Sequence, residues 1–191
     1  MKVAAVIAAG GTGTRMNAPV PKQFVEIAGK PVFIHTIERI SSLEEVIQII
    51  LALPEAHIPA ATAILSGLEV RIATECIAGG SNRQESVHRG VRHAHADADV
   101  IMVHDAVRPV CDRDTMRRVL DAAWEKGAAV PGLPATETIQ RVPRKGRASR
   151  LQLEQTGGHR EHGILDPLFG FFPASAAELI EPDLVAAAVA L

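Results

Sequence analysis

The sequence is poor in aromatic side chains, with no tyrosine, one tryptophan and five phenylalanines among 191 residues. Proteins that bind single-stranded nucleic acid use aromatic rings as stacking platforms for the bases, and few rings are available here for that purpose. Any base that this chain recognises must therefore be read by backbone groups. No basic stripe compensates, since the formal net charge is −2, and nucleic acid is not expected as a partner.

Cysteines and long apolar runs are also scarce. The two cysteines, Cys76 and Cys111, lie far apart and match no metal-ligand spacing, so we expect free thiols in a reducing compartment. No apolar run approaches the ~20 residues of a membrane span, and no membrane partner is expected. The chain opens directly on an apolar strand pattern without a signal-peptide pattern, so the expected location is cytoplasmic.

The chain does contain an alternation of apolar runs and amphipathic segments, which predicts strands that alternate with helices. Strands are expected over 3–9, 46–53, 70–73, 100–104 and 128–130, and helices over 31–40, 58–65, 83–95 and 113–125, with a final helix after Pro182. This order is typical of a single α/β domain with a Rossmann-like, doubly wound, mostly parallel sheet. Such sheets bind ligands at the carboxyl ends of their strands.

The first of these strand ends carries Ala8-Ala9-Gly10-Gly11-Thr12-Gly13-Thr14-Arg15-Met16. Three glycines let the backbone turn sharply and bring its N–H groups close to a bulky anion, and Arg15 and Lys22 add positive charge beside them. A dinucleotide fingerprint would need a helix directly after the glycines, which Pro19 and Pro21 forbid, and a Walker loop would need Gly-Lys-Ser/Thr. The loop is therefore predicted to bind a triphosphate, with a purely structural turn as the alternative.

Another predicted strand runs into Val103-His104-Asp105-Ala106-Val107-Arg108-Pro109. Asp105 is placed to hold Mg²⁺, which prefers one or two carboxylates together with substrate phosphates, and the planar fork of Arg108 suits a second anionic group. Taken alone, the two residues indicate a salt bridge that caps a turn, whereas the nearby glycine loop favours the ligand-binding interpretation. His104 has no nucleophile to pair with and is expected to pack near the strand end.

Two further segments allow two interpretations each. Gly79–Val87 is a helix entrance, which is either a cap with a surface helix or a loop in which Gly80 and Ser81 contact a base through backbone groups, with Ser86 lining the pocket. Thr138 follows a proline at another predicted strand end. It is either a hydrogen-bond donor to a substrate phosphate or a surface threonine.

Together these motifs resemble the 2-C-methyl-D-erythritol 4-phosphate cytidylyltransferases of the non-mevalonate isoprenoid pathway. The resemblance is carried, in the order and at the spacing of that family, by Ala9–Met16, Pro21-Lys22-Gln23-Phe24, Gly79–Val87 and Val103–Pro109. The glycine loop is also similar to that of the related ribitol-phosphate cytidylyltransferases. The segment Arg83-Gln84-Glu85-Ser86-Val87 looks more like the methylerythritol enzymes.

The resemblance implies a nucleotide-diphospho-sugar transferase type of fold and the transfer of CMP from CTP to a polyol phosphate, with release of pyrophosphate. It implies that Arg15 and Lys22 stabilise the charge developing at the α-phosphate. Asp105 would support Mg²⁺ or another divalent cation, and Asp105, Arg108 and Thr138 would bind the sugar phosphate. The nucleotide would be held by Ala8, Ala9, Gly10, Gly11, Thr12, Gly13, Gly80, Ser81, Ser86 and Ala106. A homodimer is also implied, with residues 139–160 as its arm.

The later part of the chain departs from the family. Gln155 falls near the place of an arm arginine, Glu137 stands where aspartate is usual, no Thr-Pro-Gln occurs, and the lysine beside Glu181-Pro182-Asp183-Leu184 is missing. The chain is also shorter than the family's usual length, and residues 161–191 are assigned only as a tail. Three alternatives stay open: a ribitol-5-phosphate cytidylyltransferase, a CTP-binding homologue that lacks turnover, and a dinucleotide-binding oxidoreductase suggested by the lone Gly-x-Gly.

Overall fold

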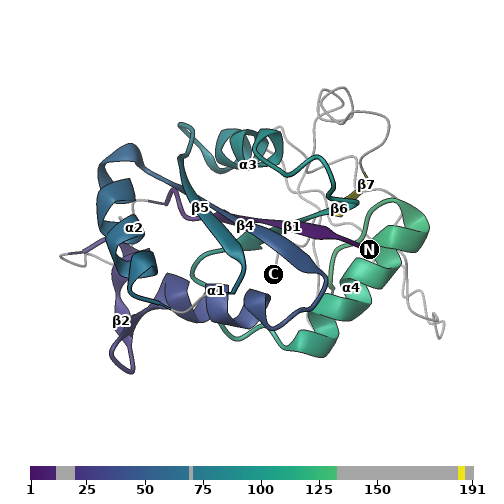
Figure 1. The fold of residues 1–191 in the computed structure, drawn as a ribbon, viewed down its shortest axis with the longest axis horizontal. Helices are drawn as coiled ribbons and strands as arrows, with labels where there is room; N and C mark the ends of the chain where they lie inside the picture. Colours follow the sequence, from purple (N-terminus) through teal and green to yellow (C-terminus); the bar gives the residue numbers. More distant parts are fainter. Residues whose placement is uncertain (12–19, 69–70, 133–184, 188–191) are drawn as a thin grey trace, which may run out of the picture. The chain divides into compact units, whose positions relative to one another are not determined.

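The computed structural model of the chain describes residues 1–11, 20–68, 71–132 and 185–187 (Figure 1). The main sheet has strands β1 (Val3–Ala8), β4 (Val46–Leu53), β5 (Ala73–Ala78), β6 (Val100–Asp105) and β7 (Val185–Ala187), and a separate hairpin has β2 (Glu26–Ile27) and β3 (Lys30–Pro31). The helices are α1 (Val32–Ser41), α2 (Ile58–Ser66), α3 (Arg83–Arg92) and α4 (Arg113–Lys126), with short 3-10 helices over Lys22–Phe24 and Glu55–His57.

The sheet is parallel throughout, with the strand order β5-β4-β1-β6-β7. The chain builds outward from β1 through β4 to β5, then crosses back and places β6 on the other side of β1. In open parallel sheets, ligands bind in the crevice where the strand order reverses. Here that position lies between β1 and β6, whose last residues, Ala8 and Asp105, are paired in register. The prediction of a doubly wound parallel α/β sheet is confirmed.

Helices cover both faces of the sheet. Because successive strand residues point to opposite sides, Val3, Ala5 and Ile7 of β1 join the core beneath α1, α2 and α4, while Ala4 and Val6 join the core beneath α3. Figure 1 shows α3 on one side of the strands and α1 and α4 on the other. A strand buried on both faces must be apolar along its length, which is why β1 reads as an unbroken hydrophobic run.

A tight hairpin leads from the glycine loop region into α1. Strands β2 and β3 pair antiparallel around Ala28 and Gly29, whose φ values of 51° and 77° are those of the central residues of a two-residue hairpin turn. The Phe24 ring meets the Phe33 ring of α1 edge-on, with 5.4 Å between the centroids. This packing fixes the short 3-10 helix, and with it Lys22, against the first helix.

Three single-element predictions are wrong. The strand expected over 70–73 is β5, at Ala73–Ala78, an edge strand whose alternating exposure gives it no continuous apolar run. No strand forms over 128–130, and β6 pairs instead with β7. That partner lies where a final helix after Pro182 was expected, so pairing with β6 overrides the helix preference of an alanine-rich segment. The other predicted boundaries agree within about three residues, a difference usual for element ends.

No helix in the described ranges is long and apolar enough to cross a membrane. The predicted arm over 139–160 lies outside the described residues, and so does the tail over 161–191 apart from β7.

Candidate active site

The carboxyl ends of the central strands bring the predicted motifs to one edge of the sheet. The Ala106 N–H donates to the Ala8 carbonyl at 3.1 Å, and the Gly79 N–H donates to the Leu53 carbonyl at 2.7 Å. These bonds extend the strand pairing by one residue beyond β6 and β5. The loops that follow β1, β5 and β6 therefore leave the sheet at the same edge, around the reversal of strand order.

The side chain of Lys22 lies over the backbone of Gly11. A Cβ at position 11 would lie 2.9 Å from Lys22 Cε and 3.2 Å from its Nζ, so a side chain there would displace the end of Lys22. Within the described ranges, Lys22 has no carboxylate at salt-bridge distance. Its ammonium group and the glycine backbone together form a positively charged surface of the kind that binds phosphate groups.

Ser86, in the first turn of α3, links the loops that follow β1 and β5. Its hydroxyl accepts the Gly80 N–H at 3.0 Å and donates to the Asn82 carbonyl at 2.8 Å. A Cβ at Gly10 would lie 3.3 Å from this hydroxyl oxygen, and a Cβ at Gly79 would lie 3.0 Å from it. Both glycine loops thus pass within contact distance of one side chain, which is only 1% exposed.

Asp105 ends β6 between two arginines. Arg83 Nε lies 3.0 Å from Asp105 Oδ1, and Arg108 Nε lies 3.1 Å from Oδ2. The salt bridge that the alternative interpretation requires is therefore present, but it is one half of a larger arrangement. Two guanidinium groups on one carboxylate leave an excess positive charge at the strand end, and both arginines are at least 47% exposed and can reach a phosphate ligand.

The side chain of His104 packs on the face of β6 opposite to that of Asp105. The neighbouring Met102 lies in the core beneath α1 and α4, and alternation along the strand directs His104 to the same face. Its ring is 1% exposed, and its Nδ1 lies 2.9 Å from the Asp105 carbonyl oxygen. Burial lowers the pKa of this imidazole below its usual value, so the ring is neutral at physiological pH. The expectation that His104 packs near the strand end is confirmed.

Most of the predicted site residues lie within the described ranges, in the loops at this edge, at the strand ends before them, or in the first turn of the helices that follow. They are Ala8, Ala9, Gly10, Gly11, Lys22, Gly80, Ser81, Ser86, Asp105, Ala106 and Arg108. Thr12, Gly13, Arg15 and Thr138 lie outside the described residues.

Three charged residues of α3 were given no role from the sequence. Arg83 reaches Asp105, Glu85 reaches Ser81, and Arg89 reaches both Glu85 and the Gly79 carbonyl. The i, i+4 spacing of Glu85 and Arg89 was a signal of their pairing. The contact between Arg83 and Asp105 carries no such signal, because it depends on how α3 lies against the sheet.

A divalent cation fits this donor set only if the substrate supplies some of its ligands. No group of three or more His, Cys, Asp or Glu side chains that could hold a metal ion occurs among the described residues. Asp105 offers one carboxylate, and each of its oxygens has two lone-pair sites, of which an arginine occupies one. Mg²⁺ is commonly bound through one or two carboxylates with phosphates and water completing its shell, and Asp105 meets that requirement.

The arrangement suits a reaction driven by positioning and charge neutralisation. The Lys22 ammonium group lies over the glycine loop that follows β1, and the buried Ser86 hydroxyl joins this loop to the one that follows β5. At the end of β6, the Asp105 carboxylate lies between two guanidinium groups. Preorganised charges of this kind stabilise developing negative charge without any reorganisation during the reaction. Such an edge is suited to extended polyanions.

Comparison with known proteins identifies relatives of this chain. The family described as 2-C-methyl-D-erythritol 4-phosphate cytidylyltransferase matches residues 3–155. The protein of that name from Acidobacterium capsulatum is 37% identical over 150 residues, which cover 75% of this chain and 63% of the relative. The one from Solibacter usitatus is 37% identical over 155 residues, which cover 75% and 62%. The chain thus spans less than two thirds of the length of either relative.

Solved structures show the same fold. A 4-diphosphocytidyl-2C-methyl-D-erythritol synthase from Anaerococcus prevotii superposes with a TM-score of 0.63 at 19% identity, over 75% of this chain and 60% of that one. A second synthase of that name gives a TM-score of 0.59 at 23% identity, over 79% and 68%. The family match extends from β1 past β6 and includes every motif at the sheet edge, and the chain belongs to the 2-C-methyl-D-erythritol 4-phosphate cytidylyltransferase family.

Proposed function

We propose that the chain transfers CMP from CTP to 2-C-methyl-D-erythritol 4-phosphate in isoprenoid precursor synthesis. The products are 4-diphosphocytidyl-2-C-methyl-D-erythritol and pyrophosphate. The observation that carries the proposal is the position of Lys22 over Gly11 at the reversal of strand order, with Asp105 and Arg108 at the neighbouring strand end. This geometry supports a triphosphate site beside a second phosphate site, and family membership suggests the two substrates.

The proposed reaction is a single displacement. A phosphate oxygen of the acceptor forms a bond to the α-phosphorus of CTP while the bond from that phosphorus to the oxygen bridging to the β-phosphate breaks. Pyrophosphate leaves with the electron pair. The step needs in-line positioning and neutralisation of charge rather than a nucleophile supplied by the protein.

The residues divide into three groups in this proposal. Lys22 stabilises negative charge at the α-phosphate and the leaving group, and the family resemblance supports the same role for Arg15. Arg108 and Thr138 bind the phosphate group of the acceptor, and Asp105 is the third residue proposed to bind this substrate. The nucleotide lies along Ala8, Ala9, Gly10, Gly11, Thr12, Gly13, Gly80, Ser81, Ser86 and Ala106.

A divalent cation, with Mg²⁺ as the expected ion, is part of the proposal. Asp105 is the residue that would hold it, through the lone pairs that its two arginines leave free. When bound, the cation neutralises charge on the phosphate groups. Asp105 also holds Arg83 and Arg108 apart at its two oxygens, which keeps both guanidinium groups at the strand end.

The assembly and the compartment are proposed as well. The family resemblance supports a homodimer formed through residues 139–160, and light scattering of the purified chain tests it. Both cysteines, Cys76 and Cys111, are unpaired thiols, and burial raises the pKa of each. Unpaired and poorly reactive thiols fit a reducing cytoplasm.

Pyrophosphate release from CTP and Mg²⁺ tests the proposal, with methylerythritol phosphate, ribitol 5-phosphate and no acceptor measured in parallel. We expect release with methylerythritol phosphate alone. Release only with ribitol 5-phosphate would assign the acceptor to the related family. No release with either acceptor, from protein that binds CTP in a calorimeter, would show a nucleotide-binding homologue without turnover.

A further inference from the structure

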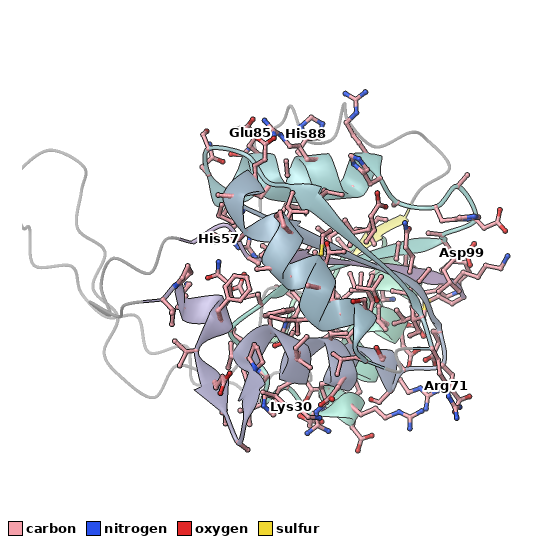
Figure 2. The ribbon with its side chains drawn as sticks, turned by 60° about the vertical axis from the view of Figure 1, so that its left-hand side comes forward. Lys30, His57, Arg71, Glu85, His88 and Asp99 are labelled. Carbon is pink, nitrogen blue, oxygen red and sulfur yellow. The ribbon has the colours of Figure 1, made fainter. Side chains whose placement is uncertain are left out.

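Glu85 of α3 has a carboxylate that the proposed mechanism does not use, yet both of its oxygens are engaged. Its Oε2 accepts the Ser81 backbone N–H at 2.8 Å and the Ser81 hydroxyl at 2.8 Å. Its Oε1 accepts Arg89 Nη2 at 2.6 Å. Figure 2 labels Glu85 at the end of α3 that adjoins the loop from β5.

Arg89 closes the arrangement into a ring. While its Nη2 contacts Glu85, its Nη1 donates to the carbonyl of Gly79 at 2.9 Å. The two side chains therefore hold the loop from both ends, the arginine at Gly79 and the carboxylate at Ser81. These residues flank Gly80, whose own N–H is taken by the Ser86 hydroxyl at 3.0 Å.

The position of Glu85 differs from that of a residue that serves only to cap the helix. Asn82 is the N-cap of α3, and its side chain accepts the Glu85 N–H at 2.9 Å. In a capping box, the glutamate at this third helical position reaches back to the N–H of the N-cap residue itself. Here the carboxylate passes the cap and binds Ser81, one residue earlier. It holds the loop rather than the helix end.

Packing adds a second constraint on the same loop. A Cβ at Gly80 would lie 2.4 Å from Glu85 Cβ and 2.3 Å from its Cγ, distances that real side chains do not adopt. The stem of Glu85 thus lies directly against the Gly80 backbone. Hydrogen bonds from Ser81, above all from its backbone N–H, lower the pKa of the Glu85 carboxyl to about 2, so the carboxylate stays charged at any physiological pH.

We propose that Glu85 is a positioning residue that, together with Arg89, fixes the Gly79–Ser81 loop in the conformation that binds the nucleotide base. The inference rests on the proposed function for the identity of the ligand. Glu85 touches no reacting atom in this role. It acts on the binding of CTP, through the loop, and leaves the displacement at phosphorus unaffected.

The variants Glu85→Ala and Glu85→Gln test the proposal against Glu38→Ala as a matched control. Glu38 pairs with Lys30 at 2.6 Å, the same separation as the pair of Glu85 with Arg89, and both carboxylates are similarly exposed. We expect Glu85→Ala to raise the calorimetric Kd of CTP and the KM for CTP by ~10-fold or more, the loss of a charged hydrogen-bond acceptor. The kcat at saturating CTP and the acceptor KM stay close to those of the parent. Glu85→Gln, which keeps an acceptor oxygen, retains part of the affinity.

Amide hydrogen exchange provides a readout that needs neither CTP nor turnover. The amides of Gly80 and Ser81 are expected to be protected in the parent and in Glu38→Ala, and the Ser81 amide to exchange faster in Glu85→Ala. Unchanged exchange in Glu85→Ala would overturn the proposal, and so would a fall of kcat at saturating CTP. A parent that protects the loop but does not bind CTP would contradict the proposed function and leave the loop-holding role of Glu85 standing.

Discussion

Single residues at this sheet edge allow charged groups to approach closely, in a way that few substitutions at the same positions would permit. Gly11 leaves room for Lys22, Gly80 leaves room for Glu85, and the carboxylate of Asp105 separates two guanidinium groups. Each of these contacts places a charge within a few ångströms of backbone that the proposed substrates would contact. Substitutions at these positions therefore separate ligand binding and chemistry from the stability of the fold.

Lys22→Ala removes the ammonium group over the glycine loop. We expect kcat to fall by about 10²–10³-fold, the usual effect of deleting one preorganised group that stabilises transition-state charge. The Tm should change little, because Lys22 forms no salt bridge within the described ranges. Lys30→Ala, which breaks only the exposed pair with Glu38, is the control. Parent-like turnover by Lys22→Ala would remove Lys22 from the mechanism.

Gly80→Ala places a methyl group against the stem of Glu85, 2.3–2.5 Å from three of its carbons. The loop must shift, and we expect CTP affinity to fall by ~10-fold or more, measured by calorimetry. Gly67→Ala is the matched control, since a Cβ there meets only a backbone oxygen at 3.5 Å. Equal CTP affinity in the two variants would show that the Gly80 loop does not contact the nucleotide.

The motifs at single positions were predictable to different degrees. Lys22 and Asp105 could be found from the sequence because each lies beside a recognisable strand end or glycine run. The partners of Arg83 and Glu85 could not be found, since Arg83 binds a residue 22 positions away and Glu85 passes over its helix cap to reach Ser81. Such contacts depend on how a helix is seated on the sheet.

At the scale of elements, the seating of α3 on the sheet determines the geometry of the site. Gly90 of α3 faces Val6 at the centre of β1, where a Cβ would lie 2.3 Å from Val6 Cγ1. This close approach fixes the depth of the helix, and its first turn then places Arg83, Glu85 and Ser86 at the loops. Strand β4 was predictable with its bounds because it is a long apolar run, whereas the edge strand β5 alternates and was misplaced by sequence pattern alone.

Gly90→Ala tests this seating. Glycine to alanine in an exposed helix position stabilises a protein by up to about 1 kcal/mol, but overpacking against Val6 should reverse the sign and lower the free energy of unfolding by about 1–3 kcal/mol. Urea denaturation measures the change. In the Val6→Ala background the cost of Gly90→Ala should shrink. Stabilisation by Gly90→Ala in the parent would contradict the close helix–sheet contact.

At the scale of the whole molecule, several carboxylates link stability to pH. Hydrogen bonds and ion pairs lower the folded-state pKa of Glu45, Glu85, Asp97 and Asp112. A carboxyl group with a lowered folded-state pKa contributes stability above its unfolded value, and this contribution is lost as the pH falls through the folded value. The molecule should therefore lose stability below about pH 4.5, the ordinary value of glutamate.

Glu45→Gln isolates one part of this dependence. Glu45 lies just before β4 and accepts a hydrogen bond from Arg117 of α4 at 2.6 Å. This bond is the largest cause of the lowered pKa of Glu45. We expect the variant to be less stable than the parent at neutral pH and equally stable at acid pH, where Glu45 is protonated in both folded and unfolded states. Denaturant titrations across the acid range measure the difference. A stability gap that is the same at every pH would contradict the role of this ion pair.

The most direct measurement of the central claim is a phosphorus NMR time course of CTP, Mg²⁺ and methylerythritol phosphate with the parent chain. Transfer at the α-phosphorus predicts that the triphosphate signals fall while two coupled diphosphate signals of the product and one pyrophosphate signal rise together, and that Lys22→Ala suppresses all three changes. Inorganic phosphate with CDP would instead show cleavage between the β- and γ-phosphates. Unchanged CTP and acceptor signals would contradict transfer outright.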